Sequence, residues 1–361
     1  MHRILLMNMM PNTVGDSILI TPLFRIIKKN YPRSFLAVTV SPKLAELYKN
    51  NKYLDKIIIV EGLDKISEPL SKLKKLAIYL KIILDLTKKI KKLNFDVCFT
   101  VHPLFFLLPV IPFLGGIKNR IGFKFKGSNL NFLLTKEIKF TYWYEDLNRH
   151  FIESYLDLLR AYDMQVKRED IIEEVFVRKE TTNKIKKILH KKGIGLKKGI
   201  ICFEAVSKFE QKNWDYRRYG ELANYLIERG YDVLLFGSPA QKDANERIRK
   251  ITNSRAFNFA GEFKFDEIAA IFKMSKLFIS PPSGLSQLAG AVGTAVLEIH
   301  GPSNPKHNMP LGKNKSYAVM YKDLQRAPVI NLSYDSPLWK EYYNSITVKQ
   351  VIKNIKKHKL I

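Results

Sequence analysis

Three short stretches of this chain bring polar side chains and glycine together directly after apolar runs of strand length. The first spans Thr13–Asp16 and follows the run Ile4–Met7. Gly15 permits a tight turn, and a carboxylate at such a turn, Asp16, can accept a proton from an attacking hydroxyl group. A second interpretation is structural, because an aspartate at the start of a helix caps free backbone amides. The residues leave both interpretations open.

The second stretch, residues 203–226, reads FEAVSKFEQKNWDYRRYGELANYL. It follows an apolar run, offers Ser207, Lys208 and Lys212, and then enters an amphipathic helix near Asp215. A lysine and a hydroxyl beside a helix start suit a phosphate group. The alternative is a solvated basic loop that Trp214 anchors to the core.

The third stretch, residues 280–305, contains SPPSGLSQLAGAVGTAVLEIHGPSNP. A strand is expected to end before Pro281, and a helix to open at Ser283 and Gly284. Glycine allows close approach to the backbone, and the free amides and dipole of a helix start favour a diphosphate. The small residues Ala289–Ala291 are also consistent with a helix that merely packs tightly on a sheet.

Other familiar chemistries are absent from the sequence. It contains no phosphate-binding P-loop, no H-E-x-x-H, no G-x-S-x-G and no Asp-x-Asp pair, so the usual ligands of a metal-dependent sugar-nucleotide site are missing. The glycines at 193–199 precede a strand instead of following one, unlike a dinucleotide-binding loop. Cys98 and Cys202 lie in apolar runs and are predicted to be buried thiols of a reducing compartment.

The elements that must position these stretches alternate between strand-like and helix-like segments, which favours an α/β fold with parallel sheets. The predicted strands are 3–8, 35–40, 56–60, 96–101, 119–123, 199–205, 232–238, 277–280 and 295–300. The predicted helices are 17–30, 42–50, 69–93, 145–162, 216–229, 241–252, 265–274, 283–292 and 347–357.

The pattern restarts after the charged stretch 178–198, which predicts two doubly wound, Rossmann-like domains facing each other across a cleft. We expect an N-terminal domain over residues 1–178 and a C-terminal domain over 179–345. The helix within 346–361 is expected to pack back on the first domain.

The net charge of +27 has two explanations. It reflects either a lysine-rich composition or an anionic partner, and nucleic acid is the weaker choice because the chain has no zinc-finger or RNA-binding motif.

The segment 69–93 carries eight lysines and one acid. It is either a core helix with a solvated lysine face or a basic amphipathic surface for anionic lipid. No signal peptide or membrane-spanning run is visible, which predicts a soluble, cytoplasmic protein whose basic segments are compatible with contact to a membrane surface.

Taken in order, these segments resemble the lipopolysaccharide heptosyltransferase family, glycosyltransferase family 9, which has the two-domain GT-B fold. The resemblance lies in RILLMNMMPNTVGDSILITPLFRIIKKNYP, in VSKFEQKNW with the following YGELANYLIERGYDVLLFGSP, and in SGLSQLAGAVGTAVLEIHGPSNP. It covers nearly the whole chain.

The resemblance implies an inverting, metal-independent transfer of a heptose or related sugar from a nucleotide diphosphate donor to an anionic, lipid-linked core saccharide. Asp16 matches the general base, and Lys212 the residue that steadies the leaving group. The donor-binding set is Ser207, Lys208, Gly237, Ser283, Gly284, Leu285, Ser286 and Gln287, and the acceptor-side set is Thr13, Gly15 and Arg120. No metal ligand and no cofactor are expected.

Three positions depart from the family pattern. Pro282 stands where the family usually has an aspartate, Gln287 where it has a histidine, and Gln241 where an acid is common. An altered donor is therefore one expectation. A catalytically silent relative that binds nucleotide or membrane is the alternative. A sugar-nucleotide epimerase is a third interpretation, but the chain has no suitable cluster of histidine and carboxylate groups.

Overall fold

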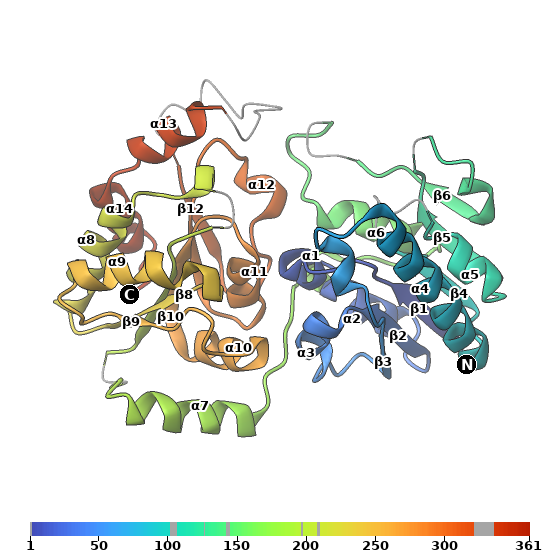
Figure 1. Cartoon of the computed structure of the whole chain (residues 1–361), viewed down its shortest axis with the longest axis horizontal. Helices are drawn as coiled ribbons and strands as arrows, with labels where there is room; N and C mark the ends of the chain where they lie inside the picture. Colours follow the sequence, from blue (N-terminus) through green and yellow to red (C-terminus); the bar gives the residue numbers. More distant parts are fainter. Residues whose placement is uncertain are drawn as a thin grey trace. The chain divides into compact units, whose positions relative to one another are not determined.

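The computed structural model describes residues 2–101, 107–125, 127–141, 145–195, 198–207, 210–320 and 336–361. The chain divides into two compact units, Met1–Phe176 and Val177–Ile361. Each unit is built around its own parallel sheet with helices packed on it (Figure 1). The α/β architecture predicted from the alternation of elements is therefore confirmed.

The described part of the first unit contains a six-stranded parallel sheet in the order β3-β2-β1-β4-β5-β6. The direction of the strand order reverses between the neighbours β1 and β4, and open α/β sheets bind ligands at the carboxyl ends of strands at such a point. The strands are β1 (Arg3–Met7), β2 (Phe35–Val40), β3 (Lys56–Ile59), β4 (Val97–Thr100), β5 (Asn119–Phe123) and β6 (Lys136–Ile138).

Helices cover both faces of this sheet, as the alternation of side chains along its strands requires. Leu5 and Cys98 point to the face that α4 and α5 cover, and there they share a core with Ile82, Leu86 and Ile90. The helical segments are α1 (Val14–Leu19), α2 (Thr21–Asn30), η1 (Pro42–Leu44), α3 (Ala45–Tyr48), η2 (Asp64–Ser67), α4 (Lys72–Leu93), α5 (Val110–Leu114), η3 (Asn131–Leu133), α6 (Ile152–Arg160) and η4 (Arg168–Asp170).

The predicted first helix over 17–30 is in fact two helices that meet at Ile20. Pro22 lies in the first turn of α2 and has no N–H to donate to the carbonyl of Ile18. The hydroxyl of Thr21 takes over this function and donates to Ile18 O at 2.7 Å. The break separates α1, the helix that carries Asp16, from the longer α2.

The second unit repeats the same strand order, β12-β11-β10-β7-β8-β9, again parallel throughout its described residues. Its direction reverses between β7 and β10, so the loops after these two strands are the expected ligand-binding loops. The strands are β7 (Ile200–Glu204), β8 (Asp232–Phe236), β9 (Phe257–Asn258), β10 (Ser275–Ser280), β11 (Ala295–Ile299) and β12 (Ser316–Val319).

The second sheet is likewise covered on both faces. On one face Phe272 of α10 packs against Phe236 and Phe278 of the sheet, and on the other Leu226 and Tyr343 join the strands in one core. The helical segments are α7 (Lys179–Lys191), η5 (Glu210–Lys212), α8 (Tyr216–Ile227), η6 (Pro239–Gln241), α9 (Lys242–Ile251), α10 (Phe265–Met274), α11 (Gly284–Ala291), α12 (Pro305–Asn308), α13 (Leu338–Ser345) and α14 (Val348–Lys357).

The last helix, α14, differs from its predicted placement on the first domain. Its apolar face, with Val348, Val351 and Ile355, is buried in the core of the second unit against α8 and β12. The physical reason is the spacing of these residues, which forms one apolar stripe that the nearest sheet can bury.

Both cysteines are buried free thiols, as predicted. Burial raises the pKa of each, that of Cys202 to about 12. Among the helices of the described ranges, none combines the length and the apolar character that a membrane span needs.

Candidate active site

Asp16 is the third residue of α1, the helix that follows the loop after β1. The helix begins after Thr13, which occupies the N-cap position, so the interpretation of Asp16 as the cap itself is wrong. Instead, the hydroxyl of Thr13 hydrogen-bonds to the Asp16 carboxyl. An acid in the first turn also interacts favourably with the helix dipole. Thr13 and Gly15, both predicted on the acceptor side, therefore lie within one turn of Asp16.

The Asp16 side chain is open to solvent, so another molecule can reach its carboxylate. The surrounding protein still removes part of its hydration and raises its pKa above the usual 3.8, while the Thr13 hydrogen bond acts in the opposite direction. Burial raises the pKa values of the Tyr48 and Tyr155 phenols, and the nearby charge of Asp16 raises them further. A reachable carboxylate with a raised pKa is a better proton acceptor than an ordinary aspartate.

A buried polar network fixes the loop in front of α1. Asn8 lies at the end of β1, where its side chain accepts from Met10 N at 3.1 Å and its carbonyl accepts from Thr39 Oγ1 at 2.8 Å. The Tyr48 hydroxyl donates to Ser17 O at 2.6 Å and so ties α3 to α1. These residues were not predicted from the sequence. The available signal was Asn8, a polar residue directly after the apolar run of β1.

Arg120, predicted on the acceptor side, lies apart from Asp16 in the sheet. It pairs with Cys98, which pairs in turn with Leu5 in the middle of β1, well before the loop that carries Asp16. Its guanidinium donates to the carbonyls of Ile117, Lys118 and Leu133, which precede β5 and β6. The side chain is thus directed toward the amino ends of the strands.

In the second unit, the predicted donor-binding residues follow strands on both sides of the reversal point. Ser207 and Lys212 come after β7, and the Ser207 backbone N–H donates to Asn213 Oδ1 at 2.6 Å. Lys212 is half-buried, with its Nζ 6.0 Å from the centre of the Trp339 ring. This cation–π contact steadies the ammonium group within the unit. Lys208 lies outside the described residues.

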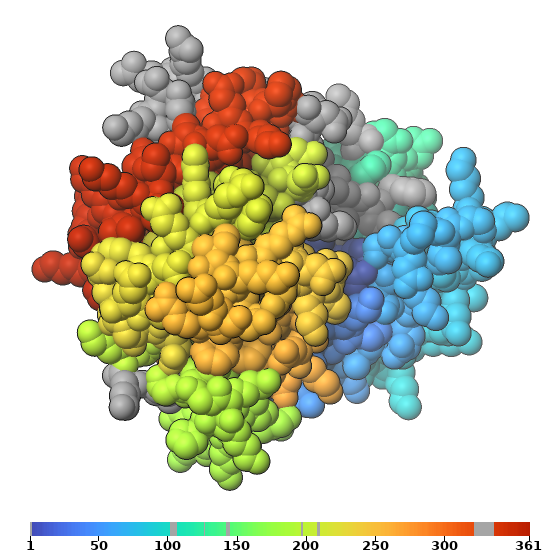
Figure 2. All heavy atoms as spheres, turned by 60° about the vertical axis from the view of Figure 1, so that its left-hand side comes forward, coloured from blue at the N-terminus to red at the C-terminus, as the bar shows by residue number. Residues whose placement is uncertain are grey.

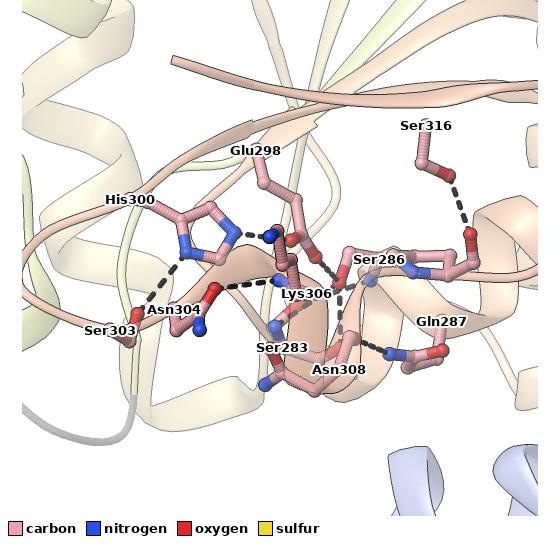
Figure 3. A network of polar contacts seen from close by, with 11 residues as sticks. Ser283, Ser286, Gln287, Glu298, His300, Ser303, Asn304, Lys306, Asn308 and Ser316 are labelled. Atoms are coloured by element: carbon pink, nitrogen blue, oxygen red, sulfur yellow. Dashed lines mark hydrogen bonds and ion pairs between the residues drawn. The ribbon is translucent and has the colours of Figure 1, made fainter. Parts of the chain in front are cut away.

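The start of α11 follows β10 (Figure 3). Ser283 and Ser286 form a reciprocal cap, each hydroxyl accepting from the other residue's N–H at 3.1 Å. The first amides of a helix have no acceptor within the helix, and at this helix they belong to Gly284 and Leu285. These two amides are therefore the groups of α11 best suited to an anionic ligand.

Two buried carboxylates accept hydrogen bonds from the serines of this helix start. Ser283 Oγ donates to Glu204 Oε2 at the end of β7, and Ser286 Oγ donates to Glu298 Oε1 of β11 at 2.6 Å. His300 Nε2 lies 2.7 Å from the other oxygen of Glu298. Burial, and secondarily the charge of Glu298, raises the pKa of Glu204 to about 7, although the Ser283 hydrogen bond opposes this.

The sequence analysis did not identify Glu204, Glu298 or His300. The available signal was an acid inside an apolar strand, since acids are almost never fully buried without a partner. Among the described residues, no group of three or more His, Cys, Asp or Glu side chains is arranged to hold a metal ion.

Gln287 and Gly237 lie in the same loops but differ in what they can offer. The Gln287 amide is buried and its nitrogen donates to Asn308 O, so this side chain connects α11 to α12 (Figure 3). At Gly237 a Cβ atom would lie 2.7 Å from Gln241 Oε1. Gln241 in turn donates to Val206 O and accepts from Ser238 N, which joins the loops after β7 and β8. Glycine at 237 is therefore required for this connection.

A pocket of about 550 Å³ borders the loop between Ala205 and Tyr216. Its lining includes Glu210 and Asp215 as well as Arg247 and Lys340. Because charges of both signs meet there, the pocket has no electrostatic preference for a diphosphate. The start of α11 remains the better anion site.

Comparison with known proteins identifies the family of the chain. Residues 83–331, most of the chain, match the family described as "Glycosyltransferase family 9 (heptosyltransferase)". The chain belongs to glycosyltransferase family 9. This family 9 glycosyltransferase is 24% identical over 318 residues to lipopolysaccharide heptosyltransferase 2 of Escherichia coli (strain K12), covering 83% of this chain and 84% of that protein. It is 25% identical to the corresponding protein of Salmonella typhimurium over 314 residues, with the same coverage.

Solved structures agree on the fold. The glycosyl transferase family 9 protein from Veillonella parvula DSM 2008 superposes with a TM-score of 0.80 at 19% identity, over 99% of this chain and 96% of that one. The E. coli ADP-heptose lps heptosyltransferase II superposes with a TM-score of 0.72 at 21% identity, over 98% of both chains. The predicted GT-B fold and the predicted family are confirmed.

Proposed function

We propose that this family 9 glycosyltransferase transfers a heptose or related sugar from a nucleotide diphosphate donor to an anionic, lipid-linked core saccharide, with inversion and without a metal ion. One observation carries the proposal: the solvent-accessible Asp16 carboxylate, with its raised pKa, follows the strand at the reversal point of the first sheet. The second sheet offers a lysine and free helix amides at its own reversal point.

In the proposed reaction Asp16 accepts the proton of the acceptor hydroxyl. The acceptor oxygen forms a bond to the anomeric carbon as the bond from that carbon to the diphosphate oxygen breaks, and attack from the opposite face inverts the configuration. Lys212 and the amides of Gly284 and Leu285 stabilise the charge on the departing diphosphate. Preorganised donors of this kind can supply the stabilisation that a metal ion gives in other enzymes.

The donor of the relatives guides the choice of sugar nucleotide. One solved relative is named an ADP-heptose heptosyltransferase, and another is described with ADP-2-deoxy-2-fluoro heptose. An ADP-linked heptose is accordingly the first donor to test. Because Pro282, Gln287 and Gln241 depart from the family pattern, GDP-, UDP- and TDP-linked sugars belong in the same screen.

A second candidate function rests on one specific contact. The amide nitrogen of Gln287 donates to Asn308 O. The family pattern places this side chain at the donor, but here it holds α12 instead. A catalytically silent relative that binds nucleotide or membrane would show the same contact. Donor binding without transfer, together with indifference to the replacement of Asp16, would favour this second function.

Replacement of Lys212 by alanine is expected to lower kcat/KM for the donor about 10-fold and to lower kcat as well, since a charge-assisted contact to the departing diphosphate is lost. Initial rates at varied donor concentration measure this. Lys276→Ala is a matched control, because Lys276 Nζ lies 5.9 Å from the Tyr231 ring centre and Lys276 is the second residue of β10, at the end of the strand opposite the ligand-binding loops. Equal effects of the two replacements would remove Lys212 from the donor site.

The proposed place of action is the cytoplasmic face of the inner membrane. The acceptor is lipid-linked, and a net charge of +27 gives the chain a long-range attraction to an anionic surface.

A further inference from the structure

The helix α4 exposes a row of leucines that the first unit does not cover. The exposed fractions of Leu73, Leu76, Leu80 and Leu84 are 80%, 52%, 53% and 60%. At about 100° per residue, these four side chains fall within a strip roughly 80° wide. We call this strip, Leu73 with Leu76, Leu80 and Leu84, the leucine stripe.

The leucine stripe is separate from the face by which α4 is attached. Ile82, Leu86 and Ile90 are buried in the core of the first unit and centre roughly 120° around the helix from the stripe. The helix therefore has two apolar sides, and only one of them is packed. A surface helix normally has a single apolar side, with polar residues elsewhere.

Exposed lysines lie along one side of the leucine stripe and at both ends of the helix. Lys81 and Lys88 border it, Lys91 continues its line toward the end of the helix, and further exposed lysines are Lys72, Lys74 and Lys92. In the part of the chain that the structure describes, no side chain of these six lysines forms an ion pair or a hydrogen bond. Asp85 is the single acid of the helix.

The neighbouring helix α5 carries two further exposed apolar side chains. Its Phe113 and Leu114 are 48% and 45% exposed. The end of α5 lies directly against α4, since a Cβ atom at Gly115 would come within 2.6 Å of Ile90 Cγ2. Residues in this part of the chain, light blue to cyan in Figure 2, are open to solvent on the right of that view.

We infer that α4 is the surface by which this enzyme docks on an anionic lipid bilayer. In an interfacial amphipathic helix, apolar side chains enter the boundary between head groups and acyl chains, and lysines lie at the level of the head groups. The leucines and lysines of α4 fit this arrangement. The helix lies on the bilayer and does not cross it. This inference deepens the proposed function, which supplies the reason for a lipid surface.

The charge of α4 decides between a bilayer and a second copy of the chain. Two copies joined through their leucine stripes would bring a dozen lysines of like sign together against only two Asp85 carboxylates, which is unfavourable. An anionic bilayer instead offers an opposite charge to each lysine, and this attraction is strongest at low salt.

The test is co-sedimentation of the full chain with vesicles of phosphatidylcholine, alone or mixed with phosphatidylglycerol. The unaltered protein is expected to bind only the mixed vesicles and to lose binding as salt is added. The double variant Leu76→Gln/Leu80→Gln should bind at least about 10-fold more weakly. Phe132→Gln is the matched control, because Phe132 is 74% exposed in η3 and lies outside α4. Its binding should not change.

A second pair of variants separates local charge from total charge. Lys74→Glu/Lys81→Glu should abolish binding, whereas Lys353→Glu/Lys356→Glu, which makes the same charge change on exposed positions of α14, should weaken it much less. Equal losses in the two pairs, unchanged binding of the leucine variant, or no vesicle binding at all would each overturn the inference. Sedimentation velocity measures the oligomeric state of the unaltered protein and of the leucine variant. If the unaltered protein is a dimer and the leucine variant a monomer, the stripe serves self-association and the inference is overturned.

The vesicle readout contains no sugar donor, so it is independent of the proposed reaction. Transfer to an acceptor fragment without lipid should be the same in the leucine variant and the unaltered protein. Asp16→Asn should lose transfer to that fragment and keep vesicle binding. If the unaltered protein transfers to the fragment but does not bind vesicles, the docking inference fails. If it binds vesicles but does not transfer, the proposed function fails.

Discussion

Asp16→Asn is expected to lower kcat by about 10²-fold or more, because the amide cannot accept the proton of the acceptor hydroxyl. Asparagine has the same shape and still accepts the Thr13 hydrogen bond. Because partial desolvation of the Asp16 carboxylate is unfavourable, its neutral replacement should not destabilise the fold. Initial rates with saturating donor and acceptor, together with thermal unfolding, provide the two measurements.

The control for this variant is Asp266→Asn in the first turn of α10, where the carboxyl accepts from the N–H of Glu267 at 2.9 Å. It removes the same charge from the first turn of a helix, so any general effect of the helix dipole appears in both variants. Equal turnover of Asp16→Asn and the unaltered enzyme would exclude Asp16 as the base.

The pH profile gives an independent readout of the same carboxyl group. Only ionised Asp16 can accept a proton, so the rate should fall as the pH drops through its pKa, and this limb should lie above the position of an ordinary aspartate. Thr13→Val removes the hydrogen bond that lowers the pKa, and should move the limb to still higher pH. A limb that stays in place would show that Thr13 does not act on Asp16.

The second large effect concerns the stability of the second unit. Glu204 has a pKa of about 7 in the folded chain against an ordinary value of 4.5. Between these two pH values the folded state binds more protons than the unfolded state, so stability falls as the pH rises. At about 1.4 kcal/mol for each pH unit, the loss amounts to about 3 kcal/mol.

Glu204→Gln should remove this loss. The variant should match the unaltered protein near pH 4.5 and exceed it by about 3 kcal/mol above pH 7, because the amide keeps an acceptor for Ser283 and carries no charge beside Glu298. Urea unfolding followed by tryptophan fluorescence is suitable, since Trp214 and Trp339 both lie in the core of the second unit.

The matched control is Glu210→Gln, an exposed acid in the loop after β7. Its stability should follow that of the unaltered protein at every pH. Parallel curves for Glu204→Gln and the unaltered protein between pH 4.5 and 7 would mean that Glu204 ionises normally, and that Glu298 does not act on it.

Sequence patterns predicted the sheets well because parallel strands buried on both faces are continuous apolar runs. Two strands, Phe35–Val40 and Asn119–Phe123, have the predicted bounds. The edge strands β6, β9 and β12 were missed because they are short and partly exposed, and have no such run. The helix α7 was taken for a charged stretch, since only Ile185 and Leu189 of it are buried.

The candidate site was predictable where a turn motif follows a strand and hidden where the partner is distant in sequence. Thr13 and Asp16 are neighbours in the chain, and so are Ser283 and Gly284. Glu204 reaches Ser283 across 79 residues, and nothing in the local pattern of either residue indicates the other. The exposure of the leucine stripe was equally hidden, because sequence periodicity marks an apolar side without showing whether another element covers it.

The separate cores of the two units have a calorimetric consequence. Each sheet carries its own buried core within its own unit, so each half of the chain can melt as its own cooperative transition. A nucleoside diphosphate bound at the start of α11 would then raise the melting temperature of one transition and leave the other in place. Differential scanning calorimetry with and without ADP would show which half of the molecule holds the nucleotide, and a uniform shift of a single peak would instead indicate that the halves unfold together.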